Sequence, residues 1–130
     1  MKKWRLALLL AFFCSAMQAQ TPFIFTERQQ FPTEQPTFPG GEAMLTGFFQ
    51  ENLRYPSLAM ENGVEGEVGI QLSLLENGEI GNIKVVEHLG LGCDEEAVRL
   101  VLALPSWHPA TLEGKPVPSE TYLKIRFRLQ

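Results

Sequence analysis

The sequence predicts an α+β domain in which two helices pack on one face of a three-stranded antiparallel sheet. Apolar residues follow helix, strand, strand, helix and strand spacing in that order, and Asn77-Gly78 marks a tight hairpin between the two adjacent strands. The connections are short, so consecutive elements are expected to lie side by side. The chain of 130 residues is long enough for one such core and too short for two.

The first 19 residues have the three parts of a secretory signal peptide. The basic start consists of Lys2, Lys3 and Arg5, and the apolar run that follows it extends from Leu6 to Phe13. A membrane-spanning helix needs about 20 apolar residues, and this run is shorter. We therefore expect cleavage after Ala19 and a periplasmic protein. The alternative is an inner-membrane anchor, with residues 1–19 retained and the domain facing the periplasm.

Residues 20–35 form a proline-containing extended leader, because proline fixes φ and lacks an N–H group. The domain itself is expected to span residues 36–130. Some of the large apolar residues in and after the leader are expected to dock on the domain: Phe23, Ile24, Phe25, Phe31 and Phe38.

The first helix of the domain is expected after Gly40-Gly41. Leu45, Phe48, Phe49 and Asn52 have the i, i+3, i+4, i+7 spacing of one helix face, and the apolar residues among them form a stripe that is expected to be buried. Tyr55-Pro56 interrupts this pattern. Pro56 suits the first position of a short second helical turn that ends at Asn62-Gly63.

A hairpin follows, in which the first strand alternates apolar and polar residues from Glu67 to Leu74. A type I′ turn at Asn77-Gly78 requires positive φ at both residues and fixes the register of the two strands. The expected partners are Ile70 with Val85, Leu72 with Ile83, and Leu74 with Gly81. This register places the apolar residues of both strands on one side and sets His88 opposite Glu67 on the other.

The second helix begins with three carboxylates, where the helix dipole favours negative charge. It starts with Asp94, Glu95 and Glu96 and stops at Pro105. Its buried stripe consists of Ala97, Leu100, Val101 and Leu104. The turn Glu113 to Pro116 then leads into the last strand, whose apolar residues alternate with charged ones up to Leu129. If this strand returns beside the first strand, it lies on an edge of the sheet.

The charge balance argues against nucleic acid as a partner. Three of the eleven Lys and Arg lie in residues 1–19, which leaves eight against fifteen Asp and Glu and a net charge of −7. An acidic domain repels phosphate backbones. The exported chain has one cysteine, Cys93, so it cannot form an internal disulfide.

The loop before the second helix contains the groups that suggest small-molecule chemistry. Gly90-Leu91-Gly92 resembles part of a dinucleotide fingerprint, but Glu95 stands at the third glycine position. Cys93 with a histidine is the basis of an alternative hypothesis, a thiol enzyme or metal protein. Because no CxxC or HxxH spacing supports a metal, we favour a structural role for Cys93, and we expect no cofactor. Trp107, between two prolines, is expected to pin a loop onto the core.

Three cations lie on the outer face of the last strand, at Lys124, Arg126 and Arg128. Charges on an edge strand deter unwanted pairing, which is one explanation for them. The other is a docking edge, where an extended peptide adds as a further strand and the cations select its sequence. Spacing alone does not decide between these two interpretations.

Several spaced motifs together resemble the TonB C-terminal domain family. They are Tyr55-Pro56 with Ala59, Asn62-Gly63-Val64-Glu65-Gly66, Asn77-Gly78, Asp94-Glu95-Glu96-Ala97 with Val98-Arg99, Pro105-Ser106-Trp107-His108-Pro109-Ala110 and Gly114-Lys115-Pro116-Val117. Two further motifs resemble the versions found in Bacteroidetes: Phe38-Pro39-Gly40-Gly41-Glu42 and Gly92-Cys93-Asp94-Glu95-Glu96. The resemblance covers about residues 36–130.

The resemblance implies a protein-binding function without catalysis. In this family the last strand pairs with a short box near the N-terminus of an outer-membrane TonB-dependent transporter, and energy passes from an inner-membrane motor complex. The docking strand implied here is Tyr122, Leu123, Lys124, Ile125, Arg126, Phe127 and Arg128. The residues implied to lie near the partner are Asn52, Arg54, Tyr55 and Pro56. Other envelope proteins, or a second copy of the chain in a homodimer, are alternative partners. The motor complex applies only to an anchored chain.

Overall fold

The computed structural model describes residues 31–130. The predicted signal peptide, and the predicted leader up to residue 30, lie outside the described residues. The helices and strands are α1 (Glu42–Asn52), α2 (Ser57–Glu61), β1 (Gly66–Leu74), β2 (Ile80–Glu87), α3 (Cys93–Leu102), β3 (Ala110–Leu112), β4 (Lys115–Val117) and β5 (Ser119–Phe127). Within residues 31–130, no helix has the length and apolar character needed to cross a membrane.

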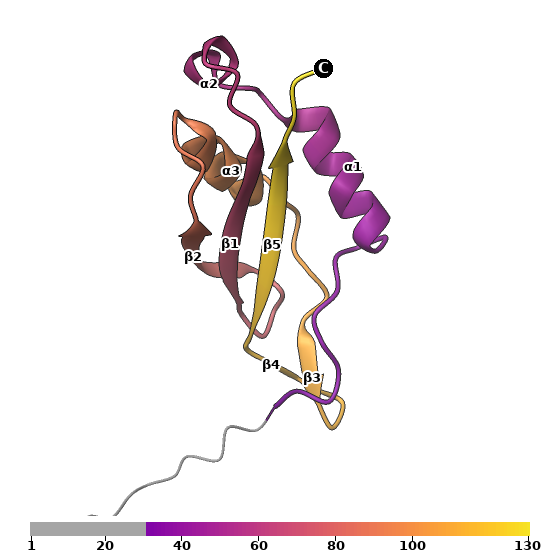
Figure 1. Cartoon of the computed structure of the whole chain (residues 1–130). Coiled ribbons are helices and arrows are strands. Elements are labelled where there is room, and N and C mark those ends of the chain that lie inside the picture. The colour runs from indigo at the N-terminus through magenta and orange to yellow at the C-terminus, as the bar shows by residue number, and fades with distance from the viewer. Residues whose placement is uncertain (1–30) are drawn as a thin grey trace, which may run out of the picture.

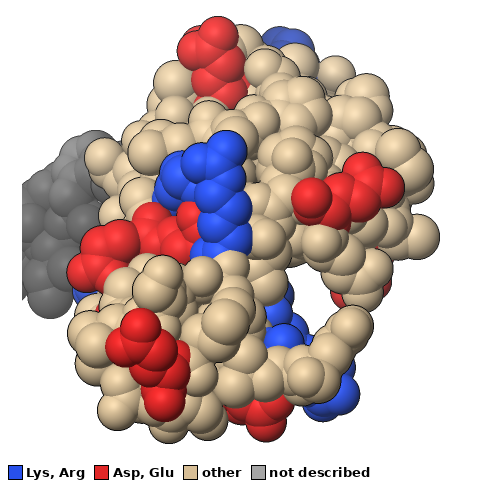
Figure 2. Space-filling view, turned by 90° about the horizontal axis from the view of Figure 1, so that it is seen from above, with Lys and Arg blue, Asp and Glu red and all other residues tan. Residues whose placement is uncertain are grey.

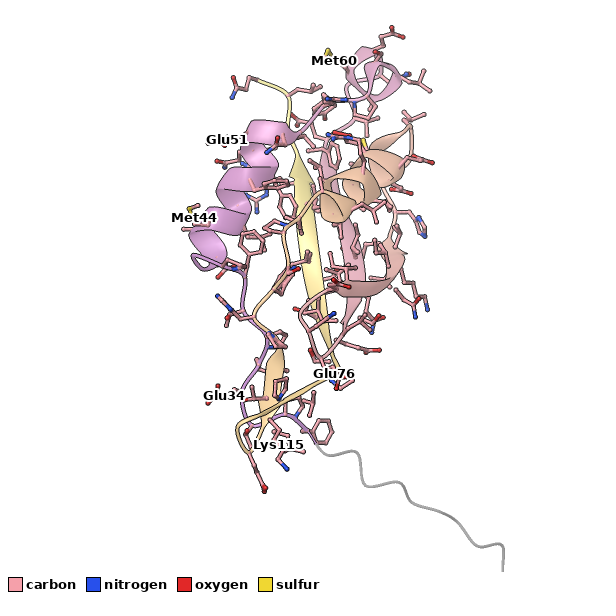
Figure 3. The ribbon with its side chains drawn as sticks, turned by 180° about the vertical axis from the view of Figure 1, so that it is seen from behind. Glu34, Met44, Glu51, Met60, Glu76 and Lys115 are labelled. Atoms are coloured by element: carbon pink, nitrogen blue, oxygen red, sulfur yellow. The ribbon has the colours of Figure 1, made fainter. Side chains whose placement is uncertain are left out.

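The main sheet is antiparallel with the strand order β2-β1-β5, so β5 lies on an edge. In Figure 1, α3 lies behind the sheet and α1 stands beside β5. From behind, both helices lie in front of the strands (Figure 3). The α+β prediction with two helices on one face of a three-stranded antiparallel sheet is therefore confirmed, as is the edge position of the last strand.

The core lies between this sheet and α3. Alternation along β5 turns Leu123, Ile125 and Phe127 inward, and all three are buried. The other large buried residues come from β1 and α3: Val68, Ile70, Leu72, Leu74, Leu100 and Val101. By contrast, α1 buries one residue, Leu45. It is therefore held to the core by less apolar surface than α3.

The predicted hairpin forms, but its turn differs from the prediction. Asn77 does not have a positive φ, whereas Gly78 does (φ +85°). The Gly78 N–H donates to the Leu75 carbonyl and the Leu75 N–H donates to the Glu79 carbonyl. This is a three-residue loop, in which a type I turn is followed by a left-handed glycine. The predicted type I′ turn at this position is wrong.

The longer loop also changes the register beside the turn. Leu74 pairs with Ile80 rather than with Gly81, and a bulge between Leu72 and Leu74 then restores the predicted Leu72–Ile83 and Ile70–Val85 pairs. A second shift pairs Gly69 with Glu87, where β2 ends. His88 consequently lies beyond the strand, and the predicted position opposite Glu67 is wrong.

A second, two-stranded sheet, β3-β4, was not predicted. Its turn has positive φ at Glu113 (+51°) and Gly114 (+81°), the requirement of a type I′ turn. The end of the leader pairs with the other side of β3. The Thr33 and Glu34 N–H groups donate to the Thr111 carbonyl, and Thr37 exchanges two hydrogen bonds with His108.

Trp107 connects this small sheet to the hairpin turn and anchors the loop on the core. Its side chain is buried and packs edge-on against Phe38, with ring centroids 5.4 Å apart. The backbone N–H of Trp107 donates to the Gly78 carbonyl at 2.8 Å. The predicted core role of Trp107 and the predicted docking of Phe38 are both confirmed, whereas Phe31 is exposed.

Candidate functional site

A groove of about 830 Å³ separates α1 from the edge strand β5. Its walls come from α1 and the chain after it on one side, and from the outer part of the sheet on the other. The lining residues are Thr46, Phe49, Gln50, Leu53, Tyr55, Glu67, Lys124, Ile125, Arg126, Arg128 and Gln130. In the view from above, the surface is hollowed, and Lys and Arg side chains lie on the rim of the opening (Figure 2).

The backbone groups of β5 that face this groove follow from the pairing of β1. In a β-strand, the backbone N–H and C=O of one residue point to the same side, and those of the next residue point to the opposite side. The Leu75 N–H donates toward β2, to Glu79, so odd-numbered residues of β1 face β2 and even-numbered ones face β5. The β1–β5 register runs unbroken from Gly66–Phe127 to Leu74–Ser119, so even-numbered residues of β1 pair with odd-numbered residues of β5.

Even-numbered residues of β5 therefore direct their backbone N–H and C=O groups away from β1. These residues are Glu120, Tyr122, Lys124 and Arg126. The Leu129 N–H fits this assignment, because it donates to Glu65 on the β1 side. A strand added to this edge would find four N–H donors and four carbonyl acceptors, and those of Lys124 and Arg126 lie beside the groove.

The three predicted cations do not have equal surroundings. Lys124 and Arg126 both pair with Glu67, at 3.7 and 3.2 Å. Arg128 lines the groove and makes no ion pair with any residue in the described part of the chain. The charge offered to a partner along this strand is thus partly neutralised by Glu67 and is least neutralised at Arg128.

Tyr122 lies across the outer face of the sheet rather than in the groove. Its hydroxyl donates to Glu87 Oε1 at 2.6 Å. This hydrogen bond to a carboxylate, together with partial burial, raises the pKa of Tyr122 to about 12. The ring has room because position 69 is a glycine, where a Cβ atom would meet the Tyr122 hydroxyl. A glycine inside a strand was the sequence signal for this close approach.

The segment after α1 is fixed mainly by contacts within the domain. The Tyr55 hydroxyl donates to the Val64 carbonyl, and its ring packs edge-on against Phe127 with centroids 5.7 Å apart. Pro56 lies against the backbone at Gly92. Of the four residues predicted near the partner, only Tyr55 lines the groove, whereas Asn52, Arg54 and Pro56 do not.

A buried carboxylate on α3 holds the same segment. Glu96 is 7% exposed and is the one buried charged side chain within residues 31–130. Its Oε2 accepts the Arg54 N–H at 2.6 Å and Arg99 Nη2 at 3.0 Å. Arg99 Nη2 also donates to the Asn52 carbonyl at 2.9 Å. From the sequence, Glu96 is expected only to favour the start of the helix. The signal missed was the i, i+3 pair Glu96–Arg99.

Cys93 is fully buried at the start of α3, and its surroundings do not activate the thiol. Burial, and then the nearby carboxylates of Asp94 and Glu95, raise the pKa of Cys93. A protonated thiol is a poor nucleophile and a poor metal ligand. His88 contacts Asp94 at 2.8 Å, and within residues 31–130 no three His, Cys, Asp or Glu side chains are grouped to hold a metal ion.

The lowered pKa values of two carboxylates, Glu96 and Asp94, make the stability of the fold depend on pH. Burial alone raises the pKa of Glu96, but hydrogen bonds from Arg99 and the Arg54 N–H outweigh it and hold the pKa below its ordinary value of 4.5. The same holds for Asp94. Burial raises its pKa, but hydrogen bonds with Leu89, His88 and Gly90 outweigh burial and hold the pKa below the ordinary value of 3.8. Groups whose pKa is lower in the folded chain stabilise it above their unfolded pKa, and this stabilisation is lost as the pH falls.

We therefore expect the free energy of unfolding, measured in urea, to fall as the pH drops from 5 to 3. Glu96→Gln should flatten this fall, because the group that gains a proton is gone. Glu76→Gln, in the exposed hairpin turn, is the matched control and should retain the wild-type slope. An equally steep fall in Glu96→Gln would contradict the assignment.

The fold and the site together define a class of small protein-interaction domain, in which an unpaired strand edge beside a groove can accept an extended segment. A family model, the Gram-negative bacterial TonB protein C-terminal, matches residues 51–129. The chain therefore belongs to the TonB protein C-terminal family. Members of this family are non-enzymatic protein-interaction domains that act in the cell envelope.

Solved structures with a similar fold are known. Two solution structures of Helicobacter pylori TonB-CTD are similar to the chain. The longer segment has a TM-score of 0.51 at 20% identity, covering 66% of this chain and 78% of that one. The shorter has a TM-score of 0.52 at 19% identity, covering 68% and 92%. No curated protein matches the chain.

Proposed function

We propose that this protein is a periplasmic binding module that takes up an extended segment of an outer-membrane TonB-dependent transporter as a fourth strand beside β5. The observation that carries the proposal is the outward-facing backbone of β5 at Tyr122, Lys124 and Arg126, of which Lys124 and Arg126 line the groove. Ladder hydrogen bonds would supply affinity, and the groove would receive alternate side chains of the added strand. Arg54, Asn52 and Pro56 would lie behind the groove wall rather than on the partner.

The other edge of the sheet, β2, is the competing candidate. Its pairing with β1 is interrupted by two register shifts, and such bulges protect an edge against further pairing. β5 is regular over its whole length and has the groove beside it. These differences favour β5 as the docking edge.

The proposal is tested by titrating the ¹⁵N-labelled domain with a synthetic peptide that carries the N-terminal box of a TonB-dependent transporter from the same organism. We expect backbone amide shifts at residues 120–128 and at groove residues of α1, with the even-numbered amides of β5 gaining protection from exchange. Shifts centred on β2, with residues 120–128 unchanged, would contradict the assignment of the edge. A scrambled peptide of the same composition is the control.

The location is a separate part of the proposal. Residues 1–19 have signal-peptide organisation, so the exported protein is expected to begin at or near Gln20. Intact mass of the protein from an envelope fraction measures this. A membrane-bound chain that retains Met1 would favour the anchored alternative. The motifs around Gly40 and Cys93 support an origin in Bacteroidetes.

A further inference from the structure

The groove wall formed by α1 depends on a contact far from the docking strand. α1 buries only Leu45, its N-cap Gly41 makes no side-chain hydrogen bond, and Phe48 and Phe49 are half-buried. Apart from Leu45, the apolar contacts of this segment with the core are therefore partial ones, made by Phe48, Phe49 and Leu53. In Figure 3, Met44 and Glu51 point away from the sheet, so the outer face of the helix adds nothing to its attachment.

The polar attachment is concentrated at the C-terminal end of α1. The Asn52 carbonyl accepts Arg99 Nη2 at 2.9 Å, and the Arg54 N–H donates to Glu96 Oε2 at 2.6 Å. These two backbone groups flank Leu53, which lines the groove. Glu96 and Arg99 thus bind the end of α1 from α3 with one acceptor and one donor, and their own pairing keeps both in place.

We propose that Glu96 and Arg99 are positioning residues that set the width of the groove and hence its affinity for an extended peptide. Neither lines the groove, so neither would touch the peptide. The pair acts through α1: a fixed helix end keeps Phe49 and Leu53 opposite β5, and binding then costs less ordering of the wall. The inference rests on the proposed function for its effect on affinity, but not for its effect on α1.

The geometry is tested in the free protein. Spin labels at Glu51→Cys on α1 and Asn82→Cys on β2, in a chain with Cys14→Ser and Cys93→Ser, report the helix-to-sheet distance by double electron–electron resonance. We expect one narrow distance distribution in the parent chain. Glu96→Gln and Arg99→Lys should each broaden it, because the first removes the charge and the second removes the forked donor.

The affinity is tested with the transporter-box peptide. Glu96→Gln and Arg99→Lys should each raise the peptide Kd about ten-fold, as expected for the loss of a charge-assisted hydrogen bond. The matched control is Glu95→Gln, which makes the same charge change on the same turn of α3 at an exposed position. It should leave both the distances and Kd unchanged.

The outcomes separate the two proposals. Narrow distances and wild-type Kd in both variants would overturn the positioning role. Broadened distances in a protein that never binds the peptide would uphold the positioning of α1 and refute the proposed function. Urea denaturation at pH 7 shows that each variant is folded, and Arg99→Lys, which keeps the positive charge beside Glu96, is the variant that best retains the fold.

Discussion

Gly78→Ala is expected to lower the free energy of unfolding by about 2–4 kcal/mol, because a side chain there meets two separate obstacles. The first is the backbone, since φ at Gly78 is +85° and L-residues adopt this conformation at a cost. The second is space, since a Cβ atom would collide with the Trp107 carbonyl. Relieving that collision moves Trp107 off the turn and breaks its hydrogen bond to the Gly78 carbonyl.

The chain contains a matched control for this prediction. Gly114 also ends a hairpin turn, with φ +81°, but a Cβ atom there meets nothing within 4 Å. Gly114→Ala should therefore lose about 1–2 kcal/mol from backbone strain alone. Urea denaturation followed by Trp fluorescence measures both variants. Equal losses would mean that the close approach of Trp107 to the turn adds nothing to stability.

Arg126→Pro is expected to weaken peptide binding about 10–100-fold and to leave the domain folded. The Arg126 N–H points to the free edge, so proline removes a donor that no residue of β1 uses. Proline is tolerated on an edge strand where the N–H faces outward. The side chain is exposed, so its loss leaves no cavity in the core.

Arg126→Ala separates the backbone effect from the charge. It removes the same ion pair with Glu67 but keeps the N–H, and exposed pairs contribute little, so its peptide Kd should change less than about five-fold. Isothermal titration at two salt concentrations measures both variants. Equal loss in Arg126→Pro and Arg126→Ala would mean that the guanidinium, and not the strand edge, holds the peptide.

The sequence was most informative where periodicity is strong. The alternation of β1 and β5 and the apolar stripe of α3 predicted the sheet, its edge and the core. The strands β3 and β4 were missed because three residues are too few to establish a period of two. The turn at Gly78 was assigned to the wrong type because Asn-Gly suits more than one loop length. The φ of Asn77 and the hydrogen bond from the Leu75 N–H to the Glu79 carbonyl distinguish them.

The candidate site was predictable on one side only. The strand that faces the groove was identified from its charges and its family motifs. On the opposite wall, Phe49 was assigned to the apolar stripe of the first helix and Leu53 was given no role, because nothing in the sequence shows that α1 stands apart from β5. The role of Glu96 was hidden for a related reason. A carboxylate in the first turn of a helix already has a local explanation, and its backbone partner, the Arg54 N–H, lies 42 residues away.

The pairing of the leader with β3 determines how the domain would respond to a mechanical load. Thr33, Glu34 and Thr37 lie antiparallel to the segment from His108 to Thr111, and the chain enters at the end of the molecule opposite the C-terminus (Figure 1). Their hydrogen bonds are perpendicular to the strands. A pull along residues 33–37 therefore loads all of these hydrogen bonds in shear at the same time. They do not break one after another from one end. The attachment of the leader to the domain therefore resists force best along the axis of the leader, which is the direction in which an extended chain would pull.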